Sequence, residues 1–210
     1  MKGPHFSFQK RTGFIPTFVS QLPKVFLILF SVLLFFSCKN AEKELAGEEL
    51  QKEKDAILAV IQKETTSFFA RDYQSWQSTF AQTDYAFQGW SNKDGTFDAS
   101  VGWDNIDKVV GSYIHENPVP DSSQRRVERK NIMYKFYGHN VAFLTWDQFN
   151  SDKGENMYLH SKETRVMEKI NGQWKIVQVA AFWDYVHPIS GDKLKDIQRM
   201  DDESRGKGKL

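Results

Sequence analysis

The spacing of hydrophobic residues changes along this chain and divides it into an apolar segment, a helical part and a strand-rich part. Residues 25–36 carry no charge and are almost wholly apolar. Between Glu48 and Ala70, apolar residues such as Ile57 and Ile61 recur every three or four positions with charged residues between them. That periodicity predicts an amphipathic helix.

Two shorter helices are expected further along. Asp72 is a good helix N-cap, and it is followed by apolar residues at helical spacing up to Phe80. Residues 84–90 are rich in aromatic side chains and lead into a turn at residues 92–95, which predicts a strand and its return. A third helix is predicted to begin near Asp104 and to end before the Pro-containing segment 117–120.

The rest of the domain is predicted to be strands. The pair Asn171-Gly172 is a strong two-residue hairpin signal, because both residues tolerate a positive φ. Three helices before an antiparallel meander indicate an α+β fold in which a curved sheet wraps over the helices. The tail from Ile189 to Leu210 has few apolar residues and is expected to be mobile. The four predicted strands are residues 127–137, 141–150, 157–170 and 174–185.

The charge of the chain argues against nucleic acid as a partner. Residues 1–37 contain four basic and no acidic residues, so 24 basic and 27 acidic residues remain in the rest, a formal charge of −3. Phosphate backbones require clustered Lys and Arg. We therefore expect no nucleic-acid binding.

The apolar segment 25–36 has the plan of an export signal. It follows a basic region, precedes Ser37-Cys38, and with twelve residues is too short to span a bilayer as a helix, which takes about 20. The segment Leu34-Phe-Phe-Ser-Cys38 resembles the lipobox of bacterial lipoproteins. The resemblance implies cleavage before Cys38, acylation of that cysteine and an envelope protein anchored to a membrane on its periplasmic face or at the cell surface. The alternatives are an uncleaved short anchor, or an ordinary signal peptide with Cys38 an incidental thiol.

The order of the elements and two motifs resemble the nuclear transport factor 2-like superfamily, including its SnoaL-like and ketosteroid-isomerase-like proteins. The motifs are Gly102-Trp-Asp-Asn-Ile106 at the third helix and Lys169-Ile-Asn-Gly-Gln-Trp-Lys-Ile-Val177 in the closing strands, with Lys162-Glu-Thr-Arg-Val166 before it. The resemblance covers residues 50–186 and implies a cone-shaped, cystatin-like fold with a pocket between sheet and helices. The chain then divides into a signal peptide (1–37), a tether (38–49), a SnoaL-like domain (50–186) and a flexible tail (187–210).

Aromatic residues are the candidates for lining that pocket. All six Trp and seven Tyr lie after Cys38, and their N–H and O–H groups orient ligands in apolar sites. The alternative is that they fill the core. The candidate ligand-binding residues are Trp90, Trp103, Tyr113, Trp146, Trp183 and Tyr185.

The acid–base candidates are Asp147, His160, Arg165 and Asp184, which come from the last three strands. Two carboxylates that hold a water, with an arginine fixing one of them, would suit an epoxide-hydrolase-like site. An aspartate base with a tyrosine hydroxyl and a protonated acid would suit a ketosteroid-isomerase-like one. The alternative is a paired surface network. A lone strand histidine such as His160 is more often a structural hydrogen-bonding residue than a proton carrier.

Other chemistry is not indicated. The sequence has no metal-ligand spacing, phosphate loop or nucleophile elbow, so no metal and no cofactor are expected. Three functions remain open. They are a lipoprotein that binds a small apolar ligand, an isomerase or hydrolase with carboxylates in the same pocket, and a dimerising association module.

Overall fold

The computed structural model describes residues 44–120, 125–152 and 154–197, which belong to a unit that begins at Glu44. The predicted signal segment and Cys38 lie outside the described residues. Among the residues described, no helix is both long and apolar enough to cross a membrane.

The first two helices follow the predicted periodicity. Helix α2 (Gly47–Ala70) buries Ile57 and Ile61 and ends where Arg71 takes a left-handed conformation, with φ of 60°. Helix α3 (Tyr73–Gln77) is capped as expected, because Asp72 accepts a hydrogen bond from the backbone N–H of Ser75. The second helix is shorter than its apolar spacing suggests.

The third helical segment contains a wide turn. It runs through α4 (Trp103–Ile106), the π-helical turn η1 (Asp107–Gly111) and α5 (Ser112–Glu116). Its N-cap is Gly102, two residues before the predicted one, and Asp104 lies in the first turn. At the π turn, the Tyr73 hydroxyl donates to Asp107 Oδ1 at 2.8 Å, which joins this segment to α3.

Six strands form one sheet in the order β2-β1-β6-β5-β4-β3. The meander of the last four strands is confirmed, because each of them pairs antiparallel with the next. One pairing departs from the expected antiparallel pattern, since β1 runs parallel to β6. The strands are β1 (Phe87–Ser91), β2 (Phe97–Val101), β3 (Arg126–Tyr137), β4 (Val141–Ser151), β5 (Met157–Ile170) and β6 (Gln173–Ser190).

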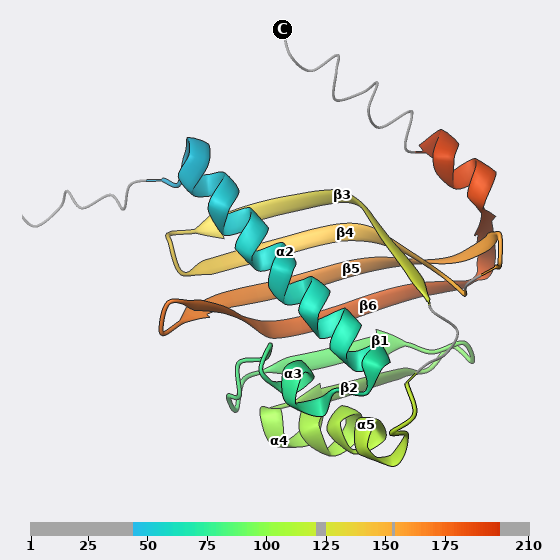
Figure 1. Cartoon of the computed structure of the whole chain (residues 1–210), viewed down its shortest axis with the longest axis horizontal. Helices are drawn as coiled ribbons and strands as arrows, with labels where there is room; N and C mark the ends of the chain where they lie inside the picture. Colours follow the sequence, from blue (N-terminus) through green and yellow to red (C-terminus); the bar gives the residue numbers. More distant parts are fainter. Residues whose placement is uncertain (1–43, 121–124, 153, 198–210) are drawn as a thin grey trace, which may run out of the picture. The chain divides into compact units, whose positions relative to one another are not determined.

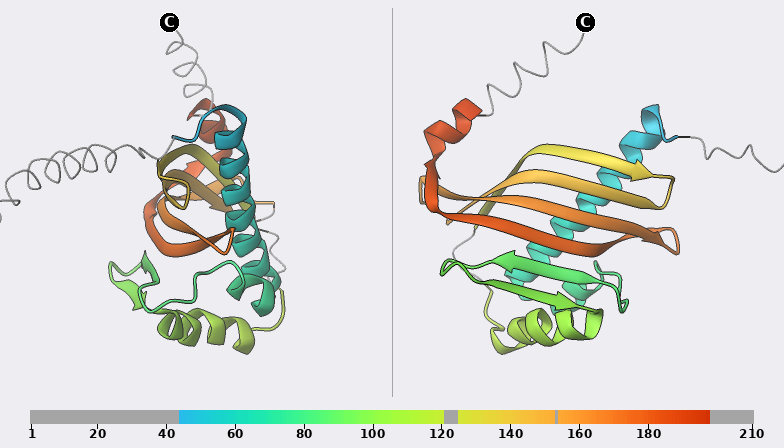
Figure 2. Two further views of the ribbon diagram at one scale, coloured as in Figure 1. Left: turned by 90° about the vertical axis from the view of Figure 1, so that its left-hand side faces the viewer. Right: turned by 180° about the vertical axis from the view of Figure 1, so that it is seen from behind.

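The main core lies between the helices and one face of the sheet. Figures 1 and 2 show α2 crossing one face of strands β3 to β6, with α4 and α5 beside β1 and β2. Trp76 of α3 and Trp146 of β4 are the largest fully buried side chains. Burying a large apolar side chain contributes roughly 1.5–3 kcal/mol, so this layer carries most of the hydrophobic stabilisation.

The end of the domain requires a correction. Residues 187–210 were expected to be a flexible tail, but β6 continues to Ser190 and residues 191–197 form a helix. Residues 198–210 lie outside the described part of the chain. Leu194 of this helix is 3% exposed and packs with Phe149 and Tyr158 in a second small core. Leu194 and the partly buried Ile189 supply the apolar contacts of this segment, so its low overall hydrophobicity did not indicate a mobile chain.

Candidate ligand-binding site

A cavity of about 480 Å³ lies between the C-terminal half of α2, the helical segment that contains the π turn, and the sheet. Five of the six strands, all but β2, contribute residues to its lining. Its size is in the range of small-molecule pockets. The lining residues are Glu64, Thr65, Phe68, Phe69, Gln88, Gly89, Trp90, Val109, Val110, Tyr113, Val127, Gln148, Asn150, Glu163, Arg165, Val179, Ala181, Trp183 and Tyr185.

Four of the six aromatic candidates lie on the cavity wall, namely Trp90, Tyr113, Trp183 and Tyr185. Tyr113 stacks on Phe68 with ring centroids 5.9 Å apart, and Arg71 lies over its ring. Trp183 and Tyr185 stack on each other at 6.1 Å, since alternate residues of β6 share a face. Aromatic rings therefore line the cavity from both the helical side and the sheet.

The other two aromatic candidates are core residues. Trp103 packs against Trp76 and Phe80 at centroid distances of 5.7 and 5.9 Å and does not line the cavity. Trp146 is 1% exposed and lies beneath the cavity, where its indole N–H donates to Gln148 at 3.3 Å. For these two residues the core-filling alternative is the one that the structure shows.

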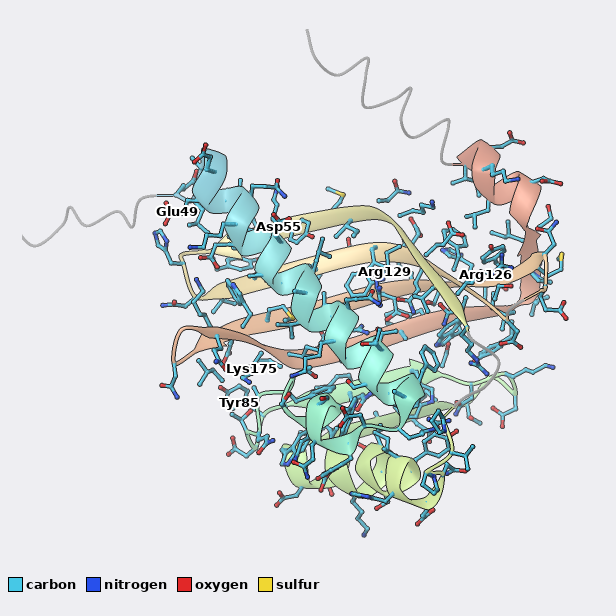
Figure 3. All side chains as sticks on the ribbon, in the orientation of Figure 1. Glu49, Asp55, Tyr85, Arg126, Arg129 and Lys175 are labelled. Atoms are coloured by element: carbon cyan, nitrogen blue, oxygen red, sulfur yellow. The ribbon has the colours of Figure 1, made fainter. Side chains whose placement is uncertain are left out.

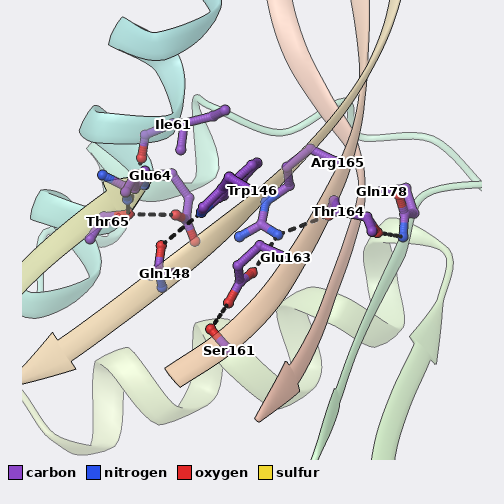
Figure 4. Close-up of polar contacts among 11 residues, drawn as sticks. Ile61, Glu64, Thr65, Trp146, Gln148, Ser161, Glu163, Thr164, Arg165 and Gln178 are labelled. Carbon is purple, nitrogen blue, oxygen red and sulfur yellow. Dashed lines mark hydrogen bonds and ion pairs between the residues drawn. The ribbon is translucent and has the colours of Figure 1, made fainter. Parts of the chain in front are cut away.

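A buried ion pair forms the polar part of the cavity (Figure 4). The guanidinium of Arg165 donates to Glu163 Oε2 at 2.8 Å and lies 4.9 Å from the Trp146 ring centroid. Glu163 Oε1 accepts from the hydroxyl of the fully buried Ser161 at 2.7 Å. Both carboxylate oxygens and one face of the guanidinium are thus fixed, so the pair presents a rigid polar surface to the cavity.

Glu64 is a second carboxyl group on the cavity wall, and its environment differs. It comes from α2 and accepts a hydrogen bond from Thr65 at 3.1 Å. Burial raises the pKa of Glu64 above its usual 4.5, and the nearby Glu163 carboxylate adds to this, although Arg165 and Arg129 oppose it. Arg129 of β3 lies beside α2 and donates to Gln62 and to Thr65 (Figure 3). The raised pKa favours a neutral carboxylic acid, which donates a hydrogen bond as well as accepting one.

Some buried polar atoms of the cavity residues have no hydrogen-bond partner within the described part of the chain. They are Gln88 Oε1, Asn150 Oδ1 and Arg165 Nε. Leaving such an atom unsatisfied costs about 1–3 kcal/mol. Either a water molecule or a polar group of a ligand satisfies such atoms.

The four acid–base candidates do not come together. Arg165 lines the cavity, whereas Asp147 and His160 face away from it, because Asp147 lies between the inward Trp146 and Gln148 of β4. Asp147 accepts from His160 at 2.9 Å and contacts Lys162 at 2.6 Å. Burial opposes ionisation of Asp147, but these bonds and one from Asn131 outweigh it and lower its pKa. This arrangement is the surface network that the sequence left open.

Asp184 also lies outside the cavity lining, and its register partner in β5 is His160. Its Oδ1 accepts from the backbone N–H groups of Val186 and His187, each at 3.0 Å, and these bonds lower its pKa. These two hydrogen bonds hold the backbone that follows Tyr185, the last cavity residue of β6. Among the described residues, no three His, Cys, Asp or Glu side chains are grouped as metal ligands.

Glu64 and Glu163, the two carboxyl groups of the cavity, were not among the sequence candidates, although the sequence contains a signal for each. Glu64 follows Ile57 and Ile61 at helical spacing, so it falls on the buried face of α2. Glu163 alternates with Ser161 and Arg165 in β5, which places the three on one face. A charged residue at a core position of a periodic pattern is the feature to search for.

Comparison with known proteins identifies the fold. No protein-family model and no curated protein matches the sequence. A protein of unknown function with a cystatin-like fold from Nostoc punctiforme superposes with a TM-score of 0.50 at 16% identity, covering 69% of this chain and 97% of that one. An NTF-2-like protein of unknown function from Shewanella oneidensis gives 0.47 at 15% identity, covering 62% of this chain and 98% of that one. The association domain of C. elegans CaMKII gives 0.48 at 16% identity, covering 62% and 95%.

The fold prediction is therefore confirmed. The domain has a cystatin-like fold, with helices packed on one face of a curved, unclosed sheet. At this level of identity the likeness concerns the fold alone.

Proposed function

We propose that this domain of the nuclear transport factor 2-like fold binds a small, mainly apolar molecule that carries one neutral polar group. The observation that carries the proposal is the combination of an apolar, aromatic-rich cavity of about 480 Å³ with a fixed Glu163–Arg165 pair at its floor. The aromatic and aliphatic walls favour the apolar body of the ligand. Because the charges of Glu163 and Arg165 compensate each other, a carbonyl or hydroxyl group suits the polar part better than an ion.

A thermal-shift experiment on the full chain in a neutral detergent tests this proposal. The probes are water-soluble cyclic ketones and alcohols such as 1-indanone and cyclohexanol, since a ligand that binds only the folded state raises the melting temperature. Val109→Trp places a large ring at the cavity wall, and Val109 is 47% exposed, so folding should tolerate the change. The shift should disappear in this variant.

Val119→Trp is the matched control, because Val119 is exposed and does not line the cavity. It should retain the shift of the unmodified protein. Equal shifts in both variants would place binding outside the cavity and contradict the proposal.

One observation favours catalysis as a second candidate. Glu64, with its raised pKa, and Glu163, fixed by hydrogen bonds, are two carboxyl groups with different environments in one cavity. Such pairs divide the roles of acid and base in isomerases and hydrolases. Glu64→Gln keeps the shape of the neutral acid but removes its proton. A binding protein should retain its ligand in this variant, whereas an enzyme should lose turnover by about 10²–10⁴-fold.

We also propose that the chain is a lipoprotein of a bacterial envelope, anchored through Cys38. The lipobox-like segment supports this, and two or more acyl chains would give stable membrane attachment. In a bacterial host, the protein should incorporate labelled palmitate and sediment with membranes. Cys38→Ala should abolish the label, and Ser37→Ala should retain it. Incorporation in the Cys38→Ala variant would contradict the assignment.

The third function, dimerisation, rests on apolar side chains of the sheet face that points away from the cavity. Phe182 of β6 is 61% exposed there, and Phe143 of β4 is 37% exposed. Sedimentation velocity of the full chain in detergent should show a dimer that Phe182→Asp dissociates, with Lys93→Asp, in the exposed loop between β1 and β2, as the control. A monomer at all protein concentrations would exclude this function.

A further inference from the structure

A second cavity, of about 560 Å³, lies away from the first one and is surrounded by lysines. It is formed by the first two-thirds of α2, the residues that follow α3, and the β5–β6 hairpin. Four lysines line it, with Glu53 as the single carboxylate among the lining residues. The lysines are Lys52, Lys63, Lys169 and Lys175.

The charge of Glu53 is already compensated inside this cavity. Its Oε2 lies 2.7 Å from Lys169 Nζ and accepts from the Trp174 indole N–H at 2.6 Å. Burial of Glu53 opposes ionisation, but the bonds to Lys169 and Trp174 outweigh it and lower the pKa. Lys169 also lies 5.0 Å from the centroid of the Trp174 ring. Lys169, Glu53 and Trp174 thus form a hydrogen-bonded group, and the Glu53 carboxylate also attracts Lys52. Lys63 and Lys175 are the lining lysines that have no such interaction with Glu53.

These two lysines converge on one neutral residue. Lys63 Nζ donates to Ser78 Oγ at 2.9 Å, and Lys175 Nζ donates to the Ser78 carbonyl oxygen at 2.5 Å. Figure 3 shows Lys175 near the start of β6, next to the β5–β6 hairpin. In the part of the chain that the structure describes, no salt bridge involves either lysine. Two ammonium groups held at one uncharged residue repel each other, and a bound anion would remove that repulsion.

We infer that this cavity is a binding site for a phosphate group. Each ammonium keeps donors beyond the one used on Ser78, and lysine is a common point-charge partner of phosphate. Lys52 lies on the same wall, with its charge partly offset by Glu53, and Gly172 adds a lining residue without a side chain. A soluble phosphate ester and a phospholipid headgroup share this chemistry. The inference does not depend on the function of the first cavity, since none of these residues lines it.

Residue-specific acetylation followed by mass spectrometry tests the site in the full chain in neutral detergent. Millimolar pyrophosphate should reduce the acetylation rates of Lys63 and Lys175 severalfold relative to sodium chloride of equal ionic strength. Lys93 and Lys195 are exposed and lie outside the cavity, so their rates should not change. In a second arm, phosphatidylglycerol replaces pyrophosphate in the micelles, with phosphatidylcholine as its control.

The two arms distinguish the sources of the phosphate. Protection by pyrophosphate identifies a soluble phosphate ligand, and protection by phosphatidylglycerol alone identifies a lipid headgroup. No protection in either arm, or equal protection of Lys93 and Lys195, would overturn the inference.

Charge-removing variants give an independent measurement by isothermal titration with the probe that protects. Lys63→Gln/Lys175→Gln should weaken binding by at least about tenfold, because two charge-assisted hydrogen bonds are lost. The matched control Lys93→Gln/Lys195→Gln changes the net charge equally and should leave affinity unchanged. Equal weakening in both would indicate a general charge effect and overturn the site.

Discussion

Glu64 makes the stability of the domain depend on pH. Its folded-state pKa is raised above 4.5, mainly by burial. The folded state therefore holds the proton more tightly than the unfolded state. The contribution of Glu64 to the free energy of unfolding is fully present below pH 4.5 and is lost as pH rises through the folded pKa. Glu64→Gln cannot ionise. Compared with the unmodified protein, this variant should gain relative stability as pH rises above 4.5.

Urea denaturation of both proteins across a range of pH measures this difference. Glu48→Gln is the control, because Glu48 is exposed in the first turn of the same helix. The free energies of unfolding of the Glu64→Gln variant and the unmodified protein could instead change with pH in parallel. That result would show that Glu64 titrates normally.

The Glu163–Arg165 pair is predicted to be costly to break. Both side chains are almost fully buried, with exposed fractions of 2% and 7%. Arg165→Met leaves the Glu163 carboxylate without its cation and should destabilise the domain by about 3–5 kcal/mol. The double variant Glu163→Gln/Arg165→Met should cost less than the single Arg165→Met change, because no uncompensated charge remains.

The exposed pair on the opposite face provides the comparison. Lys162 is 54% exposed and bonds to Asp147, so Lys162→Met should cost no more than about 1 kcal/mol by urea denaturation. Similar losses for Lys162→Met and Arg165→Met would mean that burial does not determine the strength of these pairs.

At the scale of elements, the π turn η1 depends on Gly111. A Cβ at this position would clash with Asp107 Oδ1 and would lie 3.0 Å from the Tyr73 ring, so Gly111→Ala must displace the Asp107 side chain and break its bond to Tyr73. That bond contributes about 0.5–1.5 kcal/mol. Gly111→Ala and Tyr73→Phe should each destabilise the domain, but their combined effect should be clearly less than the sum.

Thermal denaturation of the two single variants and the double variant measures this coupling. Ser112→Ala, on the next residue of the same segment, should stay within about 0.5 kcal/mol of the unmodified protein. Strict additivity of the Gly111 and Tyr73 changes would contradict the role assigned to the turn.

The types of most elements and the hairpin-connected strand pairs could be predicted from the sequence, whereas pairings between distant segments could not. Helical spacing and the Asp72 cap located α2 and α3, and the turn at Asn171-Gly172 located the β5–β6 hairpin, where φ is 51° and 76°. Phe80 shares the helical spacing of Trp76 but forms a parallel bridge with Ile176. Strand pairing depends on backbone groups far apart in the sequence, which a local pattern does not contain.

At the scale of the whole molecule, the helix of residues 191–197 closes the second small core. Leu194→Ala removes the contact with Phe149 and Tyr158 and should destabilise the domain by about 2 kcal/mol. This value is at the lower end for buried leucines, because the second core is small. Lys195→Ala is the control, since Lys195 is 80% exposed. Denaturation in guanidinium gives both values, and equal stabilities would show that the last helix is not docked.

The sequence by itself determined the nature of most elements, the antiparallel order of the last four strands, the α+β fold and the expectation of an aromatic pocket. These follow from residue spacing, turn chemistry and short motifs, which are local properties. Only the tertiary structure decided that Trp90 and Trp183 line the cavity while Trp103 and Trp146 fill the core. It also separated Arg165 from Asp147 and brought Glu64 of α2 to Arg165 of β5. Alternation shows which residues share a face, but the face that meets the cavity is set by packing between distant segments.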